Sequence, residues 1–251
     1  MRRRLPLLSF ADRALGKSPG SPPPRKKEAL CLIHGSNFSF GDNELADTSF
    51  TFWSLYARHH KYHYVRMLDA AAEEDVPASP GCARKWQMVS AVSTLLAQDR
   101  CELLLFLDLD VMIADFKVPL LGLLQRWGFA DHHLIAQPID PGFPWDTVHF
   151  PNGTQGVALN TGFMFFKDRP RTREIVEQWQ RCPLGVWNHF IRPTLAQEEV
   201  LVLPCGKYVR HYWGWDGHAK ATAAFREGIL KYAEEAMLLY ASLHGQLQQF
   251  T

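Results

Sequence analysis

Residues 103–115 read LLLFLDLDVMIAD, an apolar run that ends in two aspartates separated by one leucine. The five consecutive apolar residues from Leu103 to Leu107 are too few to span a membrane and are typical of a strand buried on both faces. Asp108 and Asp110 stand two positions apart, so on an extended backbone their side chains point the same way. Adjacent carboxylates repel each other, and a divalent cation such as Mg²⁺ or Mn²⁺ relieves that repulsion. The pattern therefore predicts a metal site at the end of a buried strand, with a solvated acidic loop as the simpler alternative.

The composition is that of a folded domain with a basic N-terminal segment. The chain has 251 residues, of which 47% are hydrophobic and 12% aromatic, values that exclude a disordered chain. Residues 1–27 hold eight Lys or Arg against one acid, a net of +7, which leaves −6 for the rest of a chain whose net charge is +1. We predict a basic, proline-rich disordered tail over residues 1–27 and one folded domain over residues 28–251. The acidic remainder argues against a nucleic-acid partner, and no segment has the ~20 apolar residues of a membrane span.

Hydrophobic periodicity predicts strands that alternate with helices beyond this tail. The expected strands cover residues 28–33, 64–68, 103–107, 134–139 and 159–166; the expected helices cover residues 48–60 (capped by Asp47 or Thr48), 83–98, 170–181 and 225–243; and residues 197–203 fit either a strand or a short helix. Such alternation is typical of an α/β domain with a parallel sheet, which binds ligands at the carboxyl ends of its strands. Both the Asp pair and a predicted turn at His34-Gly35-Ser36 fall at such ends.

The five cysteines show no metal-binding spacing. Cys31 and Cys101 lie in apolar runs and are expected to be buried thiols. Cys182 and Cys205 are candidates for a disulfide, which the sequence alone does not establish.

The order of these elements, with Leu-Asp-Leu-Asp after the third strand, resembles the GT-A nucleotide-sugar glycosyltransferases. Later motifs are similar to the retaining galactosyl- and xylosyltransferases related to galactomannan galactosyltransferase and xyloglucan xylosyltransferase. These motifs are Arg84-Lys85-Trp86, Leu159-Asn160-Thr161-Gly162, Gln197-Glu198-Glu199, His211-Tyr212-Trp213-Gly214 and His244-Gly245. The resemblance covers residues 28–245 and implies a single GT-A (Rossmann-like) α/β domain with a mostly parallel central sheet.

The resemblance also implies an activity. A metal-dependent transferase of this kind moves a hexose or pentose from a nucleoside-diphosphate sugar to a glycan or glycoconjugate acceptor, with retention. Asp108 and Asp110 would hold Mn²⁺ or Mg²⁺, with His244 as the third ligand and His211 as the alternative. The resemblance places such an enzyme in the Golgi or secretory lumen, while the lack of a visible targeting segment leaves the cytoplasm open.

Further residues are expected around the bound donor. The donor-binding candidates are His34, Gly35, Ser36, Lys85 (or Arg84), Asn160 and Gly162, and the catalytic candidates are Gln197 and Glu198. Lys85 would face the diphosphate as a fixed cation, although a solvated helix start explains it equally simply. Asn160 interrupts an apolar strand, and an amide in such a place usually has a hydrogen-bond partner, either backbone or a sugar hydroxyl.

Two other classes compete with this interpretation. A haloacid-dehalogenase-like phosphatase also ends a buried strand in Asp-x-Asp and binds Mg²⁺, but that fold normally carries the motif on its first strand. It also needs a later paired-Asp motif, and none follows Asp115. A glycosyltransferase-like binding protein without catalysis is the second alternative, because fold alone does not establish activity.

Overall fold

A six-stranded sheet forms the centre of the molecule. The computed structural model describes residues 26–36, 43–68, 83–139, 147–181, 187–204, 208–212 and 216–248. In order across the sheet, its strands are β2 (His63–Leu68), β1 (Cys31–Ser36), β3 (Leu103–Leu107), β8 (Phe163–Lys167), β5 (Ile135–Pro138) and β9 (Val200–Leu203). Within it, β8 alone is antiparallel to its neighbours. The predicted α/β domain with a mostly parallel central sheet is confirmed.

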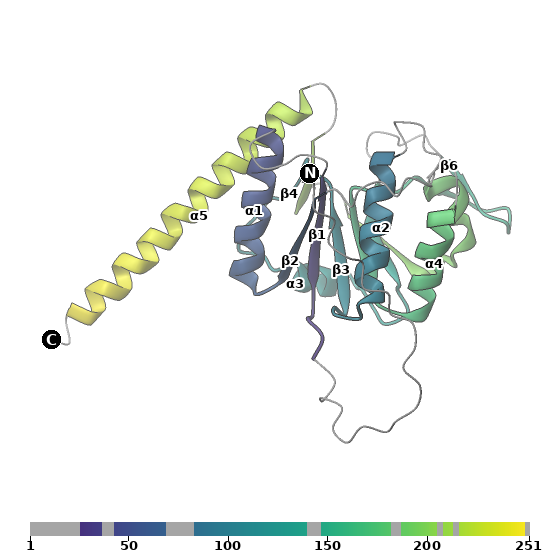
Figure 1. The fold of residues 1–251 in the computed structure, drawn as a ribbon, viewed down its shortest axis with the longest axis horizontal. Helices are drawn as coiled ribbons and strands as arrows, with labels where there is room; N and C mark the ends of the chain where they lie inside the picture. The colour runs from purple at the N-terminus through teal and green to yellow at the C-terminus, as the bar shows by residue number, and fades with distance from the viewer. Residues whose placement is uncertain are drawn as a thin grey trace, which may run out of the picture.

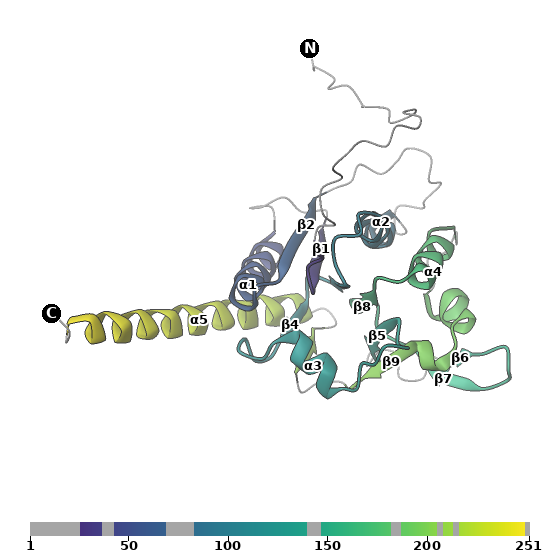
Figure 2. The same cartoon turned by 90° about the horizontal axis from the view of Figure 1, so that it is seen from below.

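Helices cover both faces of this sheet (Figures 1 and 2). The helices α1 (Glu44–His60), α3 (Leu120–Arg126) and the start of α5 (Gly217–Gln248) share one core, and α2 (Ala83–Ala97) and α4 (Pro170–Arg181) share the other. Along β3, Leu104 and Phe106 enter the core beneath α2 and α4, whereas Leu105 and Leu107 enter the core beneath α1. Burial on both faces explains why this strand is apolar without interruption.

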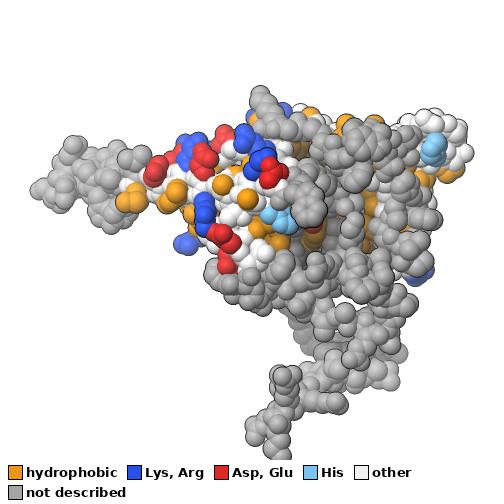
Figure 3. All heavy atoms as spheres, turned by 90° about the horizontal axis from the view of Figure 1, so that it is seen from above, with side chains coloured by type: hydrophobic (Ala, Val, Ile, Leu, Met, Phe, Trp, Pro, Cys, Tyr) orange, Lys and Arg blue, Asp and Glu red, His pale blue; other side chains and the backbone are white. Residues whose placement is uncertain are grey.

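The helix α5 packs against α1 only over its first part and then projects beyond the sheet (Figure 1). Figure 3 shows charged side chains of both signs interspersed with hydrophobic ones along its exposed surface. Leu230 and Met237 are the most exposed large hydrophobic residues in the described part of the chain, at 64% and 72%.

Several short elements were not predicted. They are β4 (Val111–Ile113), which pairs with β10 (Val209–His211), the hairpin of β6 (Thr147–His149) and β7 (Gln155–Val157), and the single-turn helices η1 (Trp187–Ile191) and η2 (Arg192–Thr194). The segment predicted as a strand or a short helix over residues 197–203 contains both, the single-turn helix η3 (Gln197–Glu199) followed by β9. Elements of three to five residues are too short for hydrophobic periodicity to reveal.

Local hydrogen bonds correct three predicted boundaries. The first helix begins at Glu44, because the Asn43 side chain accepts a hydrogen bond from the Ala46 amide at 3.0 Å, so the cap predicted at Asp47 or Thr48 is wrong. Strand β1 continues through Ser36, so the segment predicted as a turn is extended. Strand β8 begins at Phe163, which leaves the Leu-Asn-Thr-Gly motif outside the strand. The helix predicted over residues 170–181 is confirmed with both boundaries.

Cys31 and Cys101 form a disulfide, with their Cα atoms 6.0 Å apart, so the expectation of buried thiols is wrong. Cys31 opens β1 and Cys101 precedes β3, and these strands are parallel neighbours. Sequence reasoning treated each cysteine alone and had no strand order with which to pair them. The other proposed pair, Cys182 and Cys205, lies outside the described residues.

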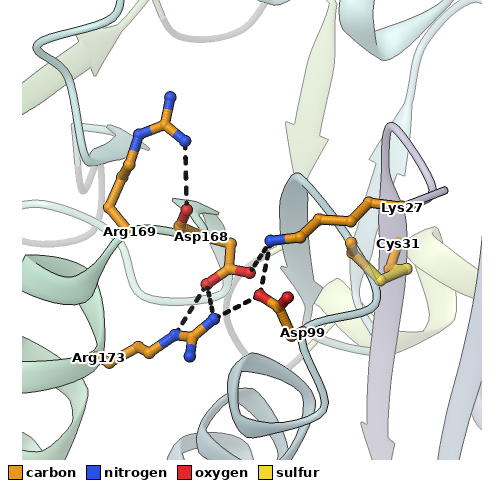
Figure 4. A network of polar contacts seen from close by, with 7 residues as sticks. Lys27, Cys31, Asp99, Asp168, Arg169 and Arg173 are labelled. Atoms are coloured by element: carbon orange, nitrogen blue, oxygen red, sulfur yellow. Dashed lines mark hydrogen bonds and ion pairs between the residues drawn. A yellow bond between two sulfur atoms is a disulfide. The ribbon is translucent and has the colours of Figure 1, made fainter. Parts of the chain in front are cut away.

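An ion-pair network lies at the same edge of the sheet (Figure 4). The Asp168 carboxylate, with 2% of its side chain exposed, is 3.0 Å from Lys27 Nζ and 2.8 Å from Arg173 Nη2. Both cations also contact Asp99, and the hydrogen bond from Lys27 is the first cause of an Asp99 pKa lowered to about 2. Lys27, the last residue of the predicted tail, therefore makes ion pairs with the folded part of the chain. The network and the disulfide together fasten the edge at which β1 and β3 begin.

Candidate metal centre

The Asp pair and the Leu-Asn-Thr-Gly motif meet at the opposite edge of the sheet. Because β8 runs antiparallel to β3, the residues before β8 lie beside the residues after β3. The amide of Asp108 donates a hydrogen bond to the Gly162 carbonyl at 2.8 Å, and Leu107 pairs with Phe163. Two motifs that are distant in sequence are thus held together by the backbone.

A turn follows Asp108, closed by a 3.3 Å hydrogen bond from the Val111 amide to the Asp108 carbonyl. Sequence reasoning assumed an extended backbone here, and the turn is a correction. The chain then enters β4, whose Val111 lies opposite His211 of β10, and the Tyr212 amide donates to the Asp110 carbonyl at 3.1 Å. The pairing of β4 with β10 therefore brings a third segment to the Asp pair.

Asp108, Asp110 and His211 form a cluster whose candidate ligand atoms all lie within 4.8 Å of one another. His211 Nε2 is 2.8 Å from Asp110 Oδ1, and their side chains are 12% and 18% exposed. Ligands bound to one ion at about 2.1 Å lie roughly 3 to 4 Å apart, so small rearrangements suffice to seat a cation. Two carboxylates and an imidazole are a donor set that suits a divalent metal ion able to accept mixed oxygen and nitrogen ligands.

His211, the alternative ligand predicted from sequence, is the histidine that the structure places beside the Asp pair. His244 lies near the far end of α5, and its side chain is outside the described set. At 1.5 Å per residue, position 244 is about 40 Å along the axis from Gly217, the first residue of α5. The helix projects away from the sheet over that length (Figure 1). The arrangement favours His211 over His244.

Two histidine variants distinguish these ligands. We expect His211→Ala to weaken Mn²⁺ binding by about 100-fold, because it removes the nitrogen ligand of a three-residue site. His244→Ala should bind Mn²⁺ as the parent does. Isothermal titration with Mn²⁺ measures both, and the reverse pattern would restore His244 as the ligand.

The position of Gly162 leaves no room for a side chain beside the cluster. A Cβ atom at this position would lie 2.5 Å from Asp108 Oδ2 and 2.8 Å from His211 Cε1, distances that atoms in real structures do not show. Gly162 therefore lets the carboxylate and the imidazole approach the backbone together. Sequence reasoning placed Gly162 at the donor, and the structure places it beside the predicted metal.

Asn160 supports that glycine. Its Oδ1 accepts a hydrogen bond from the Gly162 amide at 2.7 Å, and its carbonyl accepts one from the buried Gln137 side chain at 3.0 Å. The first of these bonds gives the side-chain amide a backbone partner, one of the two kinds of partner that the sequence left open. The Asn160 side chain therefore has a structural role in the turn, and Asn160 also lines the adjacent cavity.

His34 is fully buried rather than exposed to a donor. Its Nδ1 lies 3.1 Å from the Tyr64 hydroxyl and its Nε2 lies 3.3 Å from Ser49 Oγ, with Phe50 packed edge-on against the ring. Desolvation lowers the pKa of His34 to about 3, against a weaker opposing hydrogen bond with the Asp108 backbone. Because a side chain without exposed surface cannot contact a donor, we propose that His34 positions Asp108 instead.

The His34 pKa predicts acid instability of the folded state. The folded-state pKa of His34, about 3, lies below the ordinary value of 6.5, so the buried neutral imidazole favours the folded state. Its contribution to the free energy of unfolding is complete above pH 6.5 and is lost as the pH falls toward 3. We expect the stability difference between the parent and His34→Phe to shrink by about 3 kcal/mol between pH 7.5 and pH 4.5. Urea unfolding at both pH values measures it. An unchanged difference would mean that His34 takes up a proton in the folded protein as readily as in the unfolded chain.

The remaining donor-binding candidates lie where the structure describes only the backbone. Lys85 and Arg84 are in the first turn of α2, and Gly35 and Ser36 end β1. Ser36 thus lies at the same sheet edge as Asp108, as predicted, because β1 and β3 are parallel neighbours. Contact of these residues with a donor stays a prediction.

Gln197 and Glu198 lie at the edge of the sheet opposite the Asp pair. They form η3 directly before β9, which runs parallel to β5, so they precede the strand rather than follow it. Gln197 Nε2 contacts Thr154 Oγ1 at 3.2 Å, and both candidates are exposed. The length of β9 separates them from the edge that holds the Asp pair, so the structure does not bring these two candidates to the metal cluster.

A cavity of about 420 Å³ adjoins the cluster. The described residues that line it are Trp127, Pro138, Ile139, Asn160, Phe163, Leu203, Pro204, Val209, Arg210, His211 and Tyr212. His211 belongs both to the cluster and to the cavity wall, so a molecule in the cavity would lie next to the cation. The volume is within the range of about 300 to 1,000 Å³ that is typical of small-molecule sites.

Comparison with solved structures identifies this architecture. The chain superposes on a glycosyltransferase involved in glycosylation of the major capsid of PBCV-1 with a TM-score of 0.57 and 13% identity, over 79% of this chain and 99% of the other. The chain has a GT-A fold. Fold similarity at this identity establishes the architecture and not the activity.

Nucleotidyltransferases are more distant structural neighbours of this GT-A domain. Examples are the 4-diphosphocytidyl-2C-methyl-D-erythritol synthase of Anaerococcus prevotii (TM-score 0.42, 7% identity, 79% of this chain and 99% of the other) and the 2-C-methyl-D-erythritol 4-phosphate cytidylyltransferase of Thermus thermophilus (TM-score 0.38, 18% identity, the same coverage). No family model and no curated protein matches the sequence. Among the described helices, none has both the length and the apolar character needed to cross a membrane.

Proposed function

We propose that this protein is a metal-dependent glycosyltransferase that moves a sugar from a nucleoside-diphosphate donor to a hydroxyl acceptor. The observation that carries the proposal is the cluster of Asp108, Asp110 and His211 at the carboxyl edge of a GT-A sheet, beside a cavity. Open α/β sheets bind their ligands at this edge. A Mn²⁺ ion held there would act as a Lewis acid on the donor diphosphate.

The reaction breaks the bond between the anomeric carbon and the diphosphate oxygen, which leaves with the electron pair. The acceptor oxygen forms the new bond to that carbon, and its proton passes to the leaving diphosphate or to solvent. Asp108 and Asp110 would hold the cation that binds the diphosphate. Gly162, which has no side chain, leaves room for the Asp108 carboxylate and the His211 imidazole beside the backbone. The end of β1 would face the nucleoside, with Lys85 as the predicted cation for the diphosphate.

We propose further that the transfer retains the anomeric configuration, as the family resemblance implies. An inverting enzyme needs a carboxylate base at the acceptor hydroxyl. Glu198, the sequence candidate for that role, lies at the other edge of the sheet. The described residues that line the cavity include no Asp or Glu. NMR of the newly formed product distinguishes the two outcomes, since a β-linkage from an α-linked donor would contradict retention.

A panel of nucleotide sugars tests the proposal directly. In the presence of Mn²⁺, a matching donor should raise the melting temperature and should be slowly hydrolysed, because ligand binding stabilises the folded state. The diphosphate nucleoside should bind more tightly than its monophosphate, since the cation acts on the diphosphate.

The outcomes separate the competing classes. Donor binding without hydrolysis or transfer would support a non-catalytic binding protein. Hydrolysis of simple phosphomonoesters, with no response to nucleotide sugars, would support a phosphatase. No response to any nucleotide sugar, with or without Mn²⁺, would contradict the glycosyltransferase proposal.

The disulfide supports an oxidising compartment for this enzyme. Disulfides persist in secretory lumens and outside cells and are rare in the reducing cytosol. The bond between Cys31 and Cys101 therefore favours the secretory lumen over the cytoplasm, the two locations that the sequence leaves open. Thiol alkylation of the protein purified from its native source, with and without reductant, measures the state of this pair.

A further inference from the structure

The cavity beside the cluster is mostly apolar. Its walls include the aromatic rings of Trp127, Phe163 and Tyr212 and the aliphatic side chains of Leu203 and Val209. A wall of this kind excludes water and offers few hydrogen bonds. It is a poor environment for a molecule with hydroxyl groups on every side, because each buried hydroxyl without a partner loses its hydration.

His211 and Asn160 line the cavity next to the metal cluster, and Arg210, which stands between Val209 and His211 on β10 and so points to the other side of that strand, also belongs to its lining. Val209 and His211 are two positions apart on β10, so their side chains point to the same side of the strand. His211 contacts Asp110, and Val209 continues the wall away from the cluster. Asn160 adds an amide whose oxygen is bonded to Gly162. One end of the cavity therefore suits a reacting hydroxyl, and the remainder suits an apolar group.

We propose that the acceptor is amphiphilic, a small molecule with a hydroxyl or sugar next to an alkyl group that occupies this cavity. The proposal deepens the proposed function and rests on it. The alkyl group lies between Trp127, Leu203 and Val209, and the hydroxyl lies beside His211, where the donor sugar would arrive. A free oligosaccharide of the same sugar lacks the part that this cavity binds.

Two commercially available glycosides test the proposal. Octyl β-D-glucopyranoside, kept below its micelle concentration, and methyl β-D-glucopyranoside differ only in the length of the alkyl group. Each buried methylene should improve binding by about fourfold. If only a little more than two methylenes of the octyl group are buried, the octyl compound should already bind about 20-fold more tightly than the methyl compound. Isothermal titration in the presence of Mn²⁺ and donor measures both affinities.

A pair of isosteric variants locates the binding. Val209→Thr places a hydroxyl in the cavity wall and should weaken octyl glucoside binding by about fivefold, because the hydroxyl must lose water. Val202→Thr makes the same change at an exposed residue of β9 (41% exposed), adjacent to Leu203 but not in the cavity wall, and should change the affinity by less than about twofold. Both variants keep the side-chain shape, so both should fold.

Equal affinity for the two glycosides, or equal loss in the two variants, would overturn the proposal. Tighter binding of a cello-oligosaccharide than of octyl glucoside would also overturn it and would indicate a glycan acceptor. If Mn²⁺-dependent donor binding is present and octyl glucoside does not bind, only the amphiphilic acceptor is wrong. If donor binding is absent as well, the proposed function itself fails.

Discussion

Replacing Asp110 with Asn is expected to abolish Mn²⁺-dependent nucleotide binding, with a loss of at least about 100-fold in affinity for the metal–nucleotide complex. The carboxylate of Asp110 is both a predicted ligand and the partner of His211 Nε2 at 2.8 Å. The substitution therefore removes a negative charge from the ligands of the cation and weakens the contact that orients the His211 imidazole. Asp108→Asn should have the same effect. Titration of each variant with Mn²⁺ and a nucleoside diphosphate measures it.

The folded state should survive both changes, because removing one of two neighbouring negative charges relieves repulsion in the metal-free protein. Asp131→Asn is the matched control, since Asp131 is a fully exposed aspartate that contacts Lys167 rather than the cluster. Full activity of either cluster variant, or of the parent protein in EDTA, would exclude metal-dependent transfer.

Gly162→Ala should weaken Mn²⁺ binding by about 10- to 100-fold without adding or removing any ligand. The new methyl group would meet Asp108 Oδ2 at 2.5 Å and His211 Cε1 at 2.8 Å, so one of the two must move. The Gly162 carbonyl also accepts the Asp108 amide, which limits how far the backbone can yield. The effect should appear in Mn²⁺ titration, with a loss of stability of about 1–3 kcal/mol in urea unfolding.

Gly122→Ala is the control for the glycine prediction. Gly122 lies inside α3, where an added Cβ would lie 3.3 Å from Pro119 and where alanine is favoured over glycine in a helix. Metal affinity should not change in this variant. If Gly162→Ala bound Mn²⁺ as tightly as Gly122→Ala, the ion would be bound elsewhere than between Asp108 and His211.

The residues that sequence reasoning located correctly are those whose position depends on short-range pattern. The apolar run of β3 and the spacing of Asp108 and Asp110 lie within one segment, and they predicted both the buried strand and the acidic cluster at its end. The order of strands and helices was sufficient for the α/β class and the mostly parallel sheet. Capping at Asn43 escaped prediction because a hydrogen bond to the Ala46 amide has no counterpart in hydrophobic periodicity.

The errors share a different cause, the pairing of distant segments. His211 meets Asp110 only because the three-residue strand β10 pairs with β4, and so short a strand leaves no periodic signal. Glu198 was a catalytic candidate because Gln197-Glu198-Glu199 resembles a segment of the family, and only the parallel pairing of β9 with β5 shows that it lies at the far edge of the sheet. The disulfide of Cys31 with Cys101 likewise requires knowing that β1 and β3 are neighbours.

The antiparallel direction of β8 has a consequence for the lifetime of the folded protein. The cation site needs Gly162 from about 50 residues beyond Asp108 and His211 from about 100 residues beyond it, so it is complete only after β8 and β10 have joined the structure. Contacts of such long sequence separation form late in folding. A bound ion therefore stabilises the native state and not the partly folded states that form before it. It should slow unfolding, while the rate of folding stays that of the metal-free chain.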